Sequence, residues 1–502
     1  MADQLAFDRS LTDPDQFTLT YELVPGQGAG GKKVDRLLDF ARQAKDDGRI
    51  TALSVTDNAG GHPALAPVAI GTEIKKIGLE PLVHFSLKDK NRNQVESHLF
   101  LYQREEFKYL LVLGGDFPKT GYCGQAKPVF DLDTIQTIEL IEHVKAGRYH
   151  CLHDLPDNPA SFSFSCGCVV SPFKMTEAEQ VWQYVKLLKK IKAGAQFIIT
   201  QLGFDLDKHK ELLLFLRQHH IEVPVLANVF VPSPKVAQIM ADGKVPGALI
   251  PSGLARKMSL ETKEERLNRA GNMIAILKGQ GYGGVHLGGN GLKFSDVCYI
   301  LDRADEQYPN WQELYAQVTY ATPNIWSLYQ GNNQHVQRSL KPGKHSAGKK
   351  INALFHSLLF EQKNITAQLF GKVCLFCASK PLLNRLLTGT EWIIKAILFS
   401  CRMCGDCTLS HSTYLCPQSG CPKKLVNGPC GGSSNGRCEV FPDRFCFYVR
   451  VYNRLDQSCT LDHLGEQPVL QPKDWALEQS SSWINHFKQP HPRCPQTREN
   501  KV

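Results

Sequence analysis

Eight cysteines cluster between positions 401 and 446 of this 502-residue sequence. The cluster opens with CRMCGDC, a Cys-x2-Cys-x2-Cys run of the kind that supplies three ligands to ferredoxin-type iron–sulfur clusters. Two later cysteines precede proline, as ferredoxin ligands do, but the distance to a fourth cysteine excludes simple ferredoxin topology. Soft thiolates at this density predict a metal centre. Its candidate ligands are Cys401, Cys404, Cys407, Cys416, Cys421, Cys430, Cys438 and Cys446.

Two kinds of metal suit these thiols. Several glycines between the later cysteines would let backbone amides approach the sulfurs of an iron–sulfur cluster. Tetrahedral zinc needs closely spaced pairs of thiolates, which the segment also supplies. We expect one or more iron–sulfur clusters, with zinc as the alternative. The segment has few large apolar residues, so the metal is expected to supply much of its folding energy.

The remaining composition favours reduced, metal-binding cysteines over disulfides. The opening MADQLAFDRSLTDPDQ has no apolar core for secretion, and the apolar run EWIIKAILFSC is too short to span a bilayer. We therefore expect a cytoplasmic protein with no membrane span, in which thiols stay reduced. The net charge of +9 comes without a long Lys/Arg run. It fits an anionic small substrate or an acidic partner and argues against nucleic acid.

Short β-rich runs alternate with helical stretches, such as 34–45 and 177–194, from about residue 17 to 290. Eight such alternations predict an α/β fold, a (β/α)8 TIM barrel. An open doubly wound sheet is the runner-up, but no GxGxxG follows the first run. The expected strands are 17–24, 50–56, 81–87, 109–115, 162–170, 195–201, 223–230 and 283–289.

The pattern divides the chain into four parts. The barrel is expected over 1–325, and the polar, basic, turn-rich segment 326–368 is interpreted as a linker. The cysteine-rich metal-binding domain follows over 369–460, and 461–502 is a polar, Pro-containing tail.

Barrels of this kind do their chemistry at the C-terminal ends of the strands. Polar residues there converge on one pocket, although any single one could be a turn or helix-cap residue. The residues at these positions are Glu22, Thr56, Asp57, His84, Asp116, Gln201, Asn228 and His286.

Five segments lie at the expected strand ends, in order: TYELVP (20–25), SVTDNAGG (54–61), LVHFSLKDKNRNQ (82–94), LVLGGD (111–116) and LLKKIKAGAQFIITQLGFD (187–205). Taken together they resemble methylenetetrahydrofolate reductase, a flavin-dependent (β/α)8 barrel, over about residues 15–310. The cysteine segment from CRMCGDC through CPKKLVNGPCGG to GRCEV resembles the cysteine-rich subunit or extension of some bacterial reductases. The resemblance implies reduction of 5,10-methylenetetrahydrofolate to 5-methyltetrahydrofolate, in one-carbon metabolism and methionine synthesis.

The resemblance assigns roles to individual residues. Glu22 becomes the general acid that protonates a folate nitrogen, with a pKa raised by burial. Asp116 binds the pterin beside the flavin, and Gln201 contacts the substrate. The implied flavin-holding positions are Thr56, Asn58, His84, Gly115, Asp116 and Lys190.

Some cofactor-holding positions depart from the family pattern. The stretch after the second strand is shortened to 57–60, and Gly114 replaces an arginine. VSPFKMTE (170–177) replaces a Tyr-Pro-Glu-x-His-Pro loop, and Gln183 replaces the helix aspartate that binds the flavin ribose. The expected cofactor is therefore FAD, with FMN as the other form.

The fused cysteine segment widens the choice of electron donor. Flavins accept electrons singly or in pairs, so the donor is NAD(P)H at the barrel mouth, or ferredoxin or a partner oxidoreductase acting through the metal centre. We expect a folate substrate and a homo-oligomer. The alternatives are a folate-barrel methyltransferase without flavin and a non-catalytic zinc adaptor.

Overall fold

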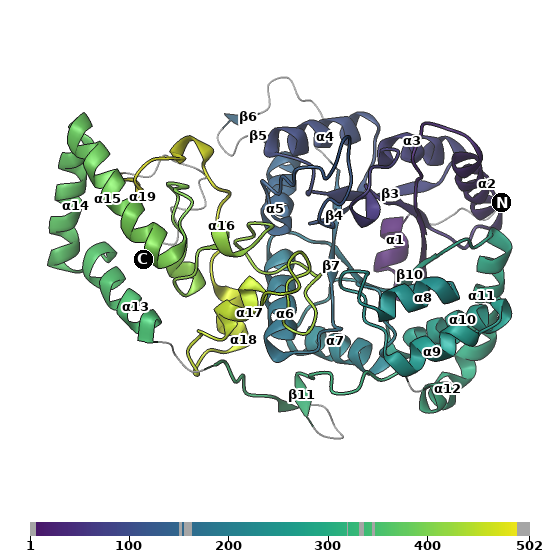
Figure 1. Ribbon diagram of the computed structural model, residues 1–502. Helices are drawn as coiled ribbons and strands as arrows, with labels where there is room; N and C mark the ends of the chain where they lie inside the picture. The colour runs from purple at the N-terminus through teal and green to yellow at the C-terminus, as the bar shows by residue number, and fades with distance from the viewer. Residues whose placement is uncertain are drawn as a thin grey trace.

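Three parts lie in a row in the computed structural model of this chain. Figure 1 shows a barrel, a loop-rich cysteine segment beside it, and an arm of three helices beyond that segment. The structure describes residues 7–149, 153–154, 163–318, 320–330, 336–343 and 347–488.

Eight parallel strands close into a barrel in the order β1-β10-β9-β8-β7-β4-β3-β2. Each predicted strand segment overlaps one of them, so the predicted (β/α)8 fold is confirmed. Most strand residues are buried, because helices cover the outside of a parallel sheet. The strands are β1 (Thr18–Leu23), β2 (Ala52–Val55), β3 (Glu80–Ser86), β4 (Tyr109–Leu113), β7 (Ser165–Val170), β8 (Phe197–Thr200), β9 (Val225–Val231) and β10 (Gly284–Gly289).

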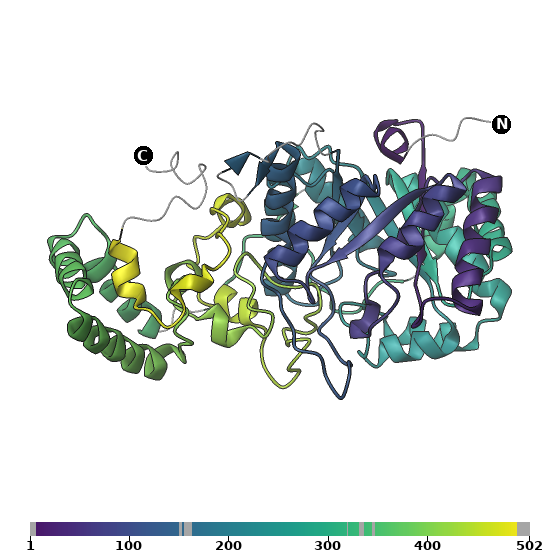
Figure 2. The same cartoon turned by 90° about the horizontal axis from the view of Figure 1, so that it is seen from above.

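Helices surround the strands (Figures 1 and 2). The helices predicted at 34–45 and 177–194 correspond to α2 and α6. A small hairpin of β5 (Arg148–Tyr149) and β6 (His153–Asp154) follows α5. The surrounding helices are α2 (Lys32–Asp47), α3 (Pro67–Ile77), α4 (Arg92–Arg104), α5 (Thr134–Lys145), α6 (Glu177–Lys192), α7 (Leu206–Gln218), α8 (Pro234–Ala241), α9 (Ser252–Leu260), α10 (Lys263–Gln280), α11 (Phe294–Gln307) and α12 (Trp311–Gln317).

Helix α1 (Phe7–Thr12) closes the end of the barrel at which the strands begin. Phe7 is fully buried, and its ring stands edge-on to Tyr109 at 4.9 Å and to Phe197 at 5.5 Å. These two aromatic residues begin β4 and β8. A ligand pocket is therefore left to the opposite end, where the strands finish.

The C-terminal third contains more helix than the sequence pattern predicted. The segment 326–368, interpreted as a linker, contains β11 (Tyr329–Gln330), β12 (Val336–Gln337) and α13. The segment 461–502, interpreted as a tail, contains α18, the 3-10 turn η4 (Trp475–Leu477) and α19, while 489–502 lie outside the described residues. The helices of this third are α13 (Ala347–Phe360), α14 (Ile365–Ala378), α15 (Pro381–Phe399), α16 (Pro417–Gly420), α17 (Phe447–Tyr452), α18 (Leu461–Glu466) and α19 (Ser482–Phe487).

The cysteine segment shares the hydrophobic core of the barrel. Tyr448 of α17 is buried against α6, and its carbonyl oxygen accepts a 3.0 Å hydrogen bond from the Trp182 indole. Their rings lie 5.3 Å apart, and the Tyr452 hydroxyl donates to the Glu177 carboxylate at 2.6 Å. Apolar burial against α6 thus contributes to the folding of this segment, in addition to any metal.

Candidate active site

A cavity of about 310 Å³ opens where the barrel strands end. It collects side chains that follow most of the strands, because the C-terminal ends of parallel strands meet at one rim. Every barrel residue singled out above lines it. These residues are Glu22, Thr56, Asp57, Asn58, His84, Gly115, Asp116, Lys190, Gln201, Asn228 and His286.

Glu22 lies beside two histidines at the floor of this cavity. His286 Nε2 is 3.7 Å from Glu22 Oε2, and Thr20 Oγ1 holds His286 Nδ1 at 2.8 Å. The ligand atoms of Glu22, His84 and His286 all lie within 4.8 Å of one another. Two imidazoles and a carboxylate at this spacing can share protons, and they also have the ligand types of a cation site.

The expected rise in the pKa of Glu22 is wrong. Burial alone would raise this pKa, but the neighbouring His286 and His84 side chains outweigh it, so the pKa lies below its ordinary value. The carboxyl group is therefore ionised at neutral pH. The sequence could not predict this, because His286 comes from the opposite end of the barrel sequence.

Several buried polar atoms of the cavity lack hydrogen-bond partners among the described residues. They include Thr56 Oγ1, His84 Nε2, Ser86 Oγ and Ser171 Oγ. Burial lowers the pKa of His84 to about 4, so its imidazole is neutral at neutral pH and can donate or accept. Buried unsatisfied polar atoms are costly, so their concentration here indicates a ligand rich in hydrogen-bonding groups. The flavin implied by the resemblance fits this description.

The backbone turn after β4 brings Asp116 into the cavity. Gly115 adopts φ +82°, and a Cβ atom at this position would lie 2.2 Å from Ser86 Oγ. Asp116 Oδ2 accepts a hydrogen bond from the Gly60 amide at 2.9 Å, while Asn58 Nδ2 donates to Asp89 Oδ2 at 3.0 Å. These bonds tie the loops after β2, β3 and β4 together on one side of the cavity.

Replacing Gly115 by alanine is expected to lower the free energy of unfolding by roughly 1–2 kcal/mol, from the left-handed backbone alone. The clash with Ser86 adds to this loss and displaces the adjoining Asp116. Thermal unfolding of the two proteins measures the effect. Gly114→Ala is the matched control, since its Cβ atom would meet nothing within 4 Å and its φ is ordinary. Equal losses in both variants would contradict the assigned role of the turn.

Lys190 and Gln201 line the far side of the cavity. Lys190 Nζ donates to the Val169 carbonyl at 2.5 Å, and burial lowers its pKa to about 8. It therefore remains mostly charged at pH 7 and can pair with an anionic group. Gln201 Oε1 accepts from the Leu202 amide at 3.0 Å.

The cysteine segment contributes the outer wall of the same cavity, which the sequence interpretation did not foresee. Lys423 Nζ donates to the Gly115 carbonyl at 2.9 Å and forms a buried ion pair with Glu439. Gln183 Nε2 donates to the Cys430 carbonyl at 3.2 Å. The contributing wall residues are Lys423, Leu425, Pro429, Cys430, Gly431, Gly432 and Glu439.

Two buried lysines anchor this wall to the barrel. Lys174 Nζ donates to the carbonyl oxygens of Gly431 at 2.5 Å and Ser433 at 2.7 Å, and Lys186 Nζ donates to that of Pro429 at 2.9 Å. Lys174 belongs to the 170–177 loop, which departs from the family pattern, as does Gln183. Both departures therefore occur where the barrel contacts its own C-terminal segment.

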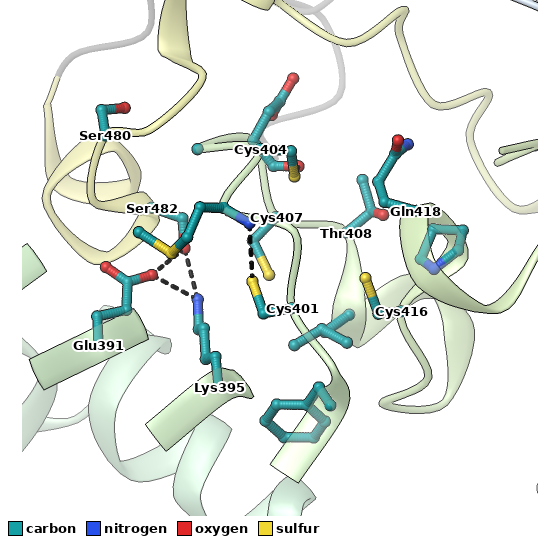
Figure 3. Close-up of a pocket in the computed structure, with 16 residues that line it drawn as sticks. Glu391, Lys395, Cys401, Cys404, Cys407, Thr408, Cys416, Gln418, Ser480 and Ser482 are labelled. Atoms are coloured by element: carbon teal, nitrogen blue, oxygen red, sulfur yellow. Dashed lines mark hydrogen bonds and ion pairs between the residues drawn. The ribbon is translucent and has the colours of Figure 1, made fainter. Parts of the chain in front are cut away.

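The eight candidate metal ligands fall into two groups of four. Figure 3 shows Cys401, Cys404, Cys407 and Cys416 around one small pocket. A buried ion pair of Lys395 and Glu391, 2.7 Å apart, borders this first quartet.

The second quartet lies at the wall of the barrel cavity. Burial, with smaller contributions from the nearby thiols of Cys421 and Cys438, raises the pKa of Cys446 to about 12. The pKa of Cys430 is raised by burial and then by Glu439, with smaller effects of Cys446 and Cys421. Cys430 belongs both to this second quartet and to the cavity wall. Buried thiols of this kind need a metal to become thiolates at neutral pH.

Two family models match the chain. The model described as methylenetetrahydrofolate reductase matches residues 7–288, and the model described as methylene-tetrahydrofolate reductase C terminal matches residues 380–476. The first covers the barrel residues that line the cavity, and the second covers α15, both quartets and α17.

Solved structures of similar fold have low sequence identity to this chain. An uncharacterised protein from Clostridium thermocellum, described as binding two copies of 5-methyl-5,6,7,8-tetrahydrofolic acid, is 11% identical with a TM-score of 0.42, covering 60% of this chain and 99% of its own. A 2,3-dimethylmalate lyase is 12% identical with a TM-score of 0.34, covering 61% and 84%. Tryptophan synthase from M. tuberculosis is 12% identical with a TM-score of 0.33, covering 62% and 96%. Values this low carry no information on activity.

Proposed function

Because the chain belongs to the methylenetetrahydrofolate reductase family, we propose that it reduces 5,10-methylenetetrahydrofolate to 5-methyltetrahydrofolate with a bound flavin. One observation carries the proposal: Glu22, Asp116 and Gln201 share a single cavity with the unsatisfied polar atoms of Thr56 and His84. Glu22, Asp116 and Gln201 are the proposed contacts of the folate, and Thr56 and His84 offer hydrogen bonds to the flavin.

Glu22 is the proton donor in this proposal. The five-membered ring of the substrate opens when a ring nitrogen is protonated and its bond to the methylene carbon breaks. The Glu22 carboxyl donates that proton, and His286, 3.7 Å away, returns one to it. Asp116 accepts hydrogen bonds from the aminopyrimidine edge of the pterin, and the Gln201 amide contacts the same ligand.

Thr56, Asn58, His84, Gly115, Asp116 and Lys190 would hold the flavin. When bound, reduced flavin supplies the hydride that completes the methyl group. The neutral His84 imidazole and the Thr56 hydroxyl offer hydrogen bonds to the ring system, and charged Lys190 suits the phosphate of FAD or FMN. The cavity wall contributed by residues between 423 and 439 would limit the access of water to a bound flavin.

We propose that electrons enter through the cysteine segment, with NAD(P)H at the barrel mouth as the alternative. Cys430 supports this route, because it borders the flavin cavity and belongs to the second quartet. Iron–sulfur clusters, when bound, supply single electrons from ferredoxin or a partner oxidoreductase.

The visible spectrum of anaerobically purified protein separates the candidate functions. The proposal expects oxidised-flavin bands over a broad shoulder that dithionite bleaches, together with turnover of methylenetetrahydrofolate. Folate binding without flavin would favour the methyltransferase alternative. A colourless protein that contains zinc would favour the adaptor.

The turnover number is expected to rise as pH falls from about 8 to about 6, by about tenfold per pH unit where proton donation limits the rate. The lowered pKa of Glu22 is the reason, because the protonated fraction of the acid grows as pH approaches that pKa from above. Stopped-flow measurement of the folate half-reaction avoids limits set by the electron donor. The Glu22→Gln variant should give a flat, low profile, and a wild-type rate that rises with pH would contradict the role of Glu22.

A further inference from the structure

The outer face of the three-helix arm is apolar. Helices α13, α14 and α15 contact one another in sequence, and α19 packs on α14 (Figures 1 and 2). Soluble monomers rarely expose an apolar patch that extends over three helices. Its exposed large residues are Ile351, Leu354, Phe355, Leu358, Ile365, Leu369, Val373, Leu375, Phe376, Leu382, Leu386, Trp392, Ile393, Ile394, Ile397 and Leu398.

Most of the exposed apolar residues of α14 and α15 lie on one face of each helix, opposite the buried face. In α15 the ion pair of Glu391 and Lys395 is buried on the inner face, and in α14 the inner face carries buried Ala367, Gly371 and Cys374. On the opposite faces, where a soluble helix carries charge, large apolar residues recur at steps of four and seven residues, which return to the same side of a helix. The outward stripes are Ile365, Leu369 and Phe376 in α14, and Leu382, Leu386, Ile393 and Ile397 in α15.

The charges around this patch are almost all positive. Between residues 348 and 400, all of which the structure describes, the acidic residues are Glu361 and the buried, paired Glu391. The other basic residues of this stretch stand near the ends of the helices or beside the apolar stripes. They are Lys350, Lys363, Lys372, Lys380 and Arg385, together with Lys349, which pairs with Asp456 at 3.1 Å.

Of the three partners that could cover this patch, a second copy, an electron donor or an anionic bilayer, the apolar stripes with basic borders fit the bilayer. A second copy of this chain, paired face to face, would set basic residues against basic residues. Interfaces with transient partners, such as electron donors, are as a whole about as apolar as the rest of a protein surface, whereas this face is more apolar. Amphipathic helices with Lys or Arg beside Trp, Phe and Leu bury their apolar face in the headgroup region of an anionic bilayer.

We propose that the arm formed by α13–α15 lies on an anionic phospholipid surface and holds the enzyme there without crossing the bilayer. In the portion of the chain that the structure describes, no helix has both the length and the hydropathy to span a membrane. Trp392, half exposed on the outer side of α15, takes the interfacial position that indoles favour. This proposal does not depend on the reductase function.

Co-sedimentation of the full-length protein with vesicles tests the proposal. Phosphatidylcholine vesicles with phosphatidylglycerol should bind the protein about tenfold more tightly than phosphatidylcholine alone, and high salt should remove the difference. The double variant Leu386→Glu/Ile397→Glu should lose vesicle binding, because two carboxylates enter the apolar stripe. Leu260→Glu is the matched control, since Leu260 on α9 is 82% exposed and Ile397 is 78% exposed.

Three results would overturn the proposal. The first is no binding to either kind of vesicle; if sedimentation velocity then gives a dimer that the double variant converts to a monomer, a second copy covers the patch. The second is equal binding to neutral and anionic vesicles at all salt concentrations. The third is an equal loss of binding in Leu260→Glu. Unchanged size-exclusion elution and thermal unfolding of each variant exclude misfolding as the cause.

Discussion

Replacing Glu22 by glutamine is expected to lower the turnover number for methylenetetrahydrofolate by roughly 10²–10⁴-fold, the contribution typical of a positioned general acid. Glutamine keeps the shape of the side chain but has no proton of suitable acidity to give the folate nitrogen. Glu22 is also the one carboxyl group that joins His84 and His286 in the cluster at the cavity floor. Single-turnover reduction by prereduced enzyme measures the effect on chemistry.

The flavin content and the folate dissociation constant of this variant should stay within a few-fold of wild type, since the proposed ligands of both molecules remain. Glu73→Gln, on the exposed surface of α3, serves as the control for the loss of a carboxylate. If Glu22→Gln keeps full single-turnover activity, another group donates the proton. If it loses flavin as well, Glu22 has a structural role.

Replacing Cys404 or Cys407 by alanine is expected to abolish turnover with reduced ferredoxin, by roughly a hundredfold or more. Loss of even an outer-shell partner of a metal ligand costs 10–100-fold, and these residues are proposed ligands themselves. Both line the pocket of the first quartet (Figure 3), while the flavin cavity is bordered by the second. Bound flavin and its chemical reduction by dithionite should therefore remain.

Cys459→Ala is the matched control, because Cys459 follows the cysteine segment but belongs to neither quartet. Iron per chain should fall by the content of one cluster in the Cys404 variant and stay unchanged in the control. Unchanged turnover with every electron donor would show that the segment is not an electron path. Loss of all activity, including that of the chemically reduced enzyme, would instead indicate that the first quartet supports the fold of the cavity wall.

The barrel and its rim were predictable because they depend on local patterns. Each strand is a short β-rich run, so its position and its C-terminal end could be found without the fold. Glu22, His84 and Gln201 could be singled out because they lie near the C-terminal ends of the predicted strands. Closure of the barrel brings them into one cavity. The cysteines could be singled out as candidate metal ligands for the same reason, since their density is a property of one short segment.

The division of the cysteines into quartets was not predictable from spacing. Cys416 and Cys421 are close in sequence and both precede proline, yet they belong to different quartets. The path of the chain between them, through the short helix α16, turns one toward α15 and the other toward the barrel.

The helix within the segment 326–368 and the exposed apolar face of the arm could not be found from the sequence either. The sequence 329–350 is polar and basic, and this obscured the apolar stripe of α13 that follows directly. The exposure of these apolar side chains depends on which helix faces are covered by α19 and which are left uncovered by the described part of the chain. Amino-acid composition does not contain that information.

The barrel, the dense cluster of thiols and the carboxylate at the end of the first strand could be found in the sequence, because each is encoded within a short stretch. How these parts contact one another depends on the folded chain. Lys174 and Gln183, read from sequence as departures from a flavin-binding pattern, contact the C-terminal segment that walls the cavity. The lowered pKa of Glu22 depends on His286, which is distant in sequence but adjacent in the closed barrel. Electrostatic and packing effects of this kind follow distance in space, and only the fold sets that distance.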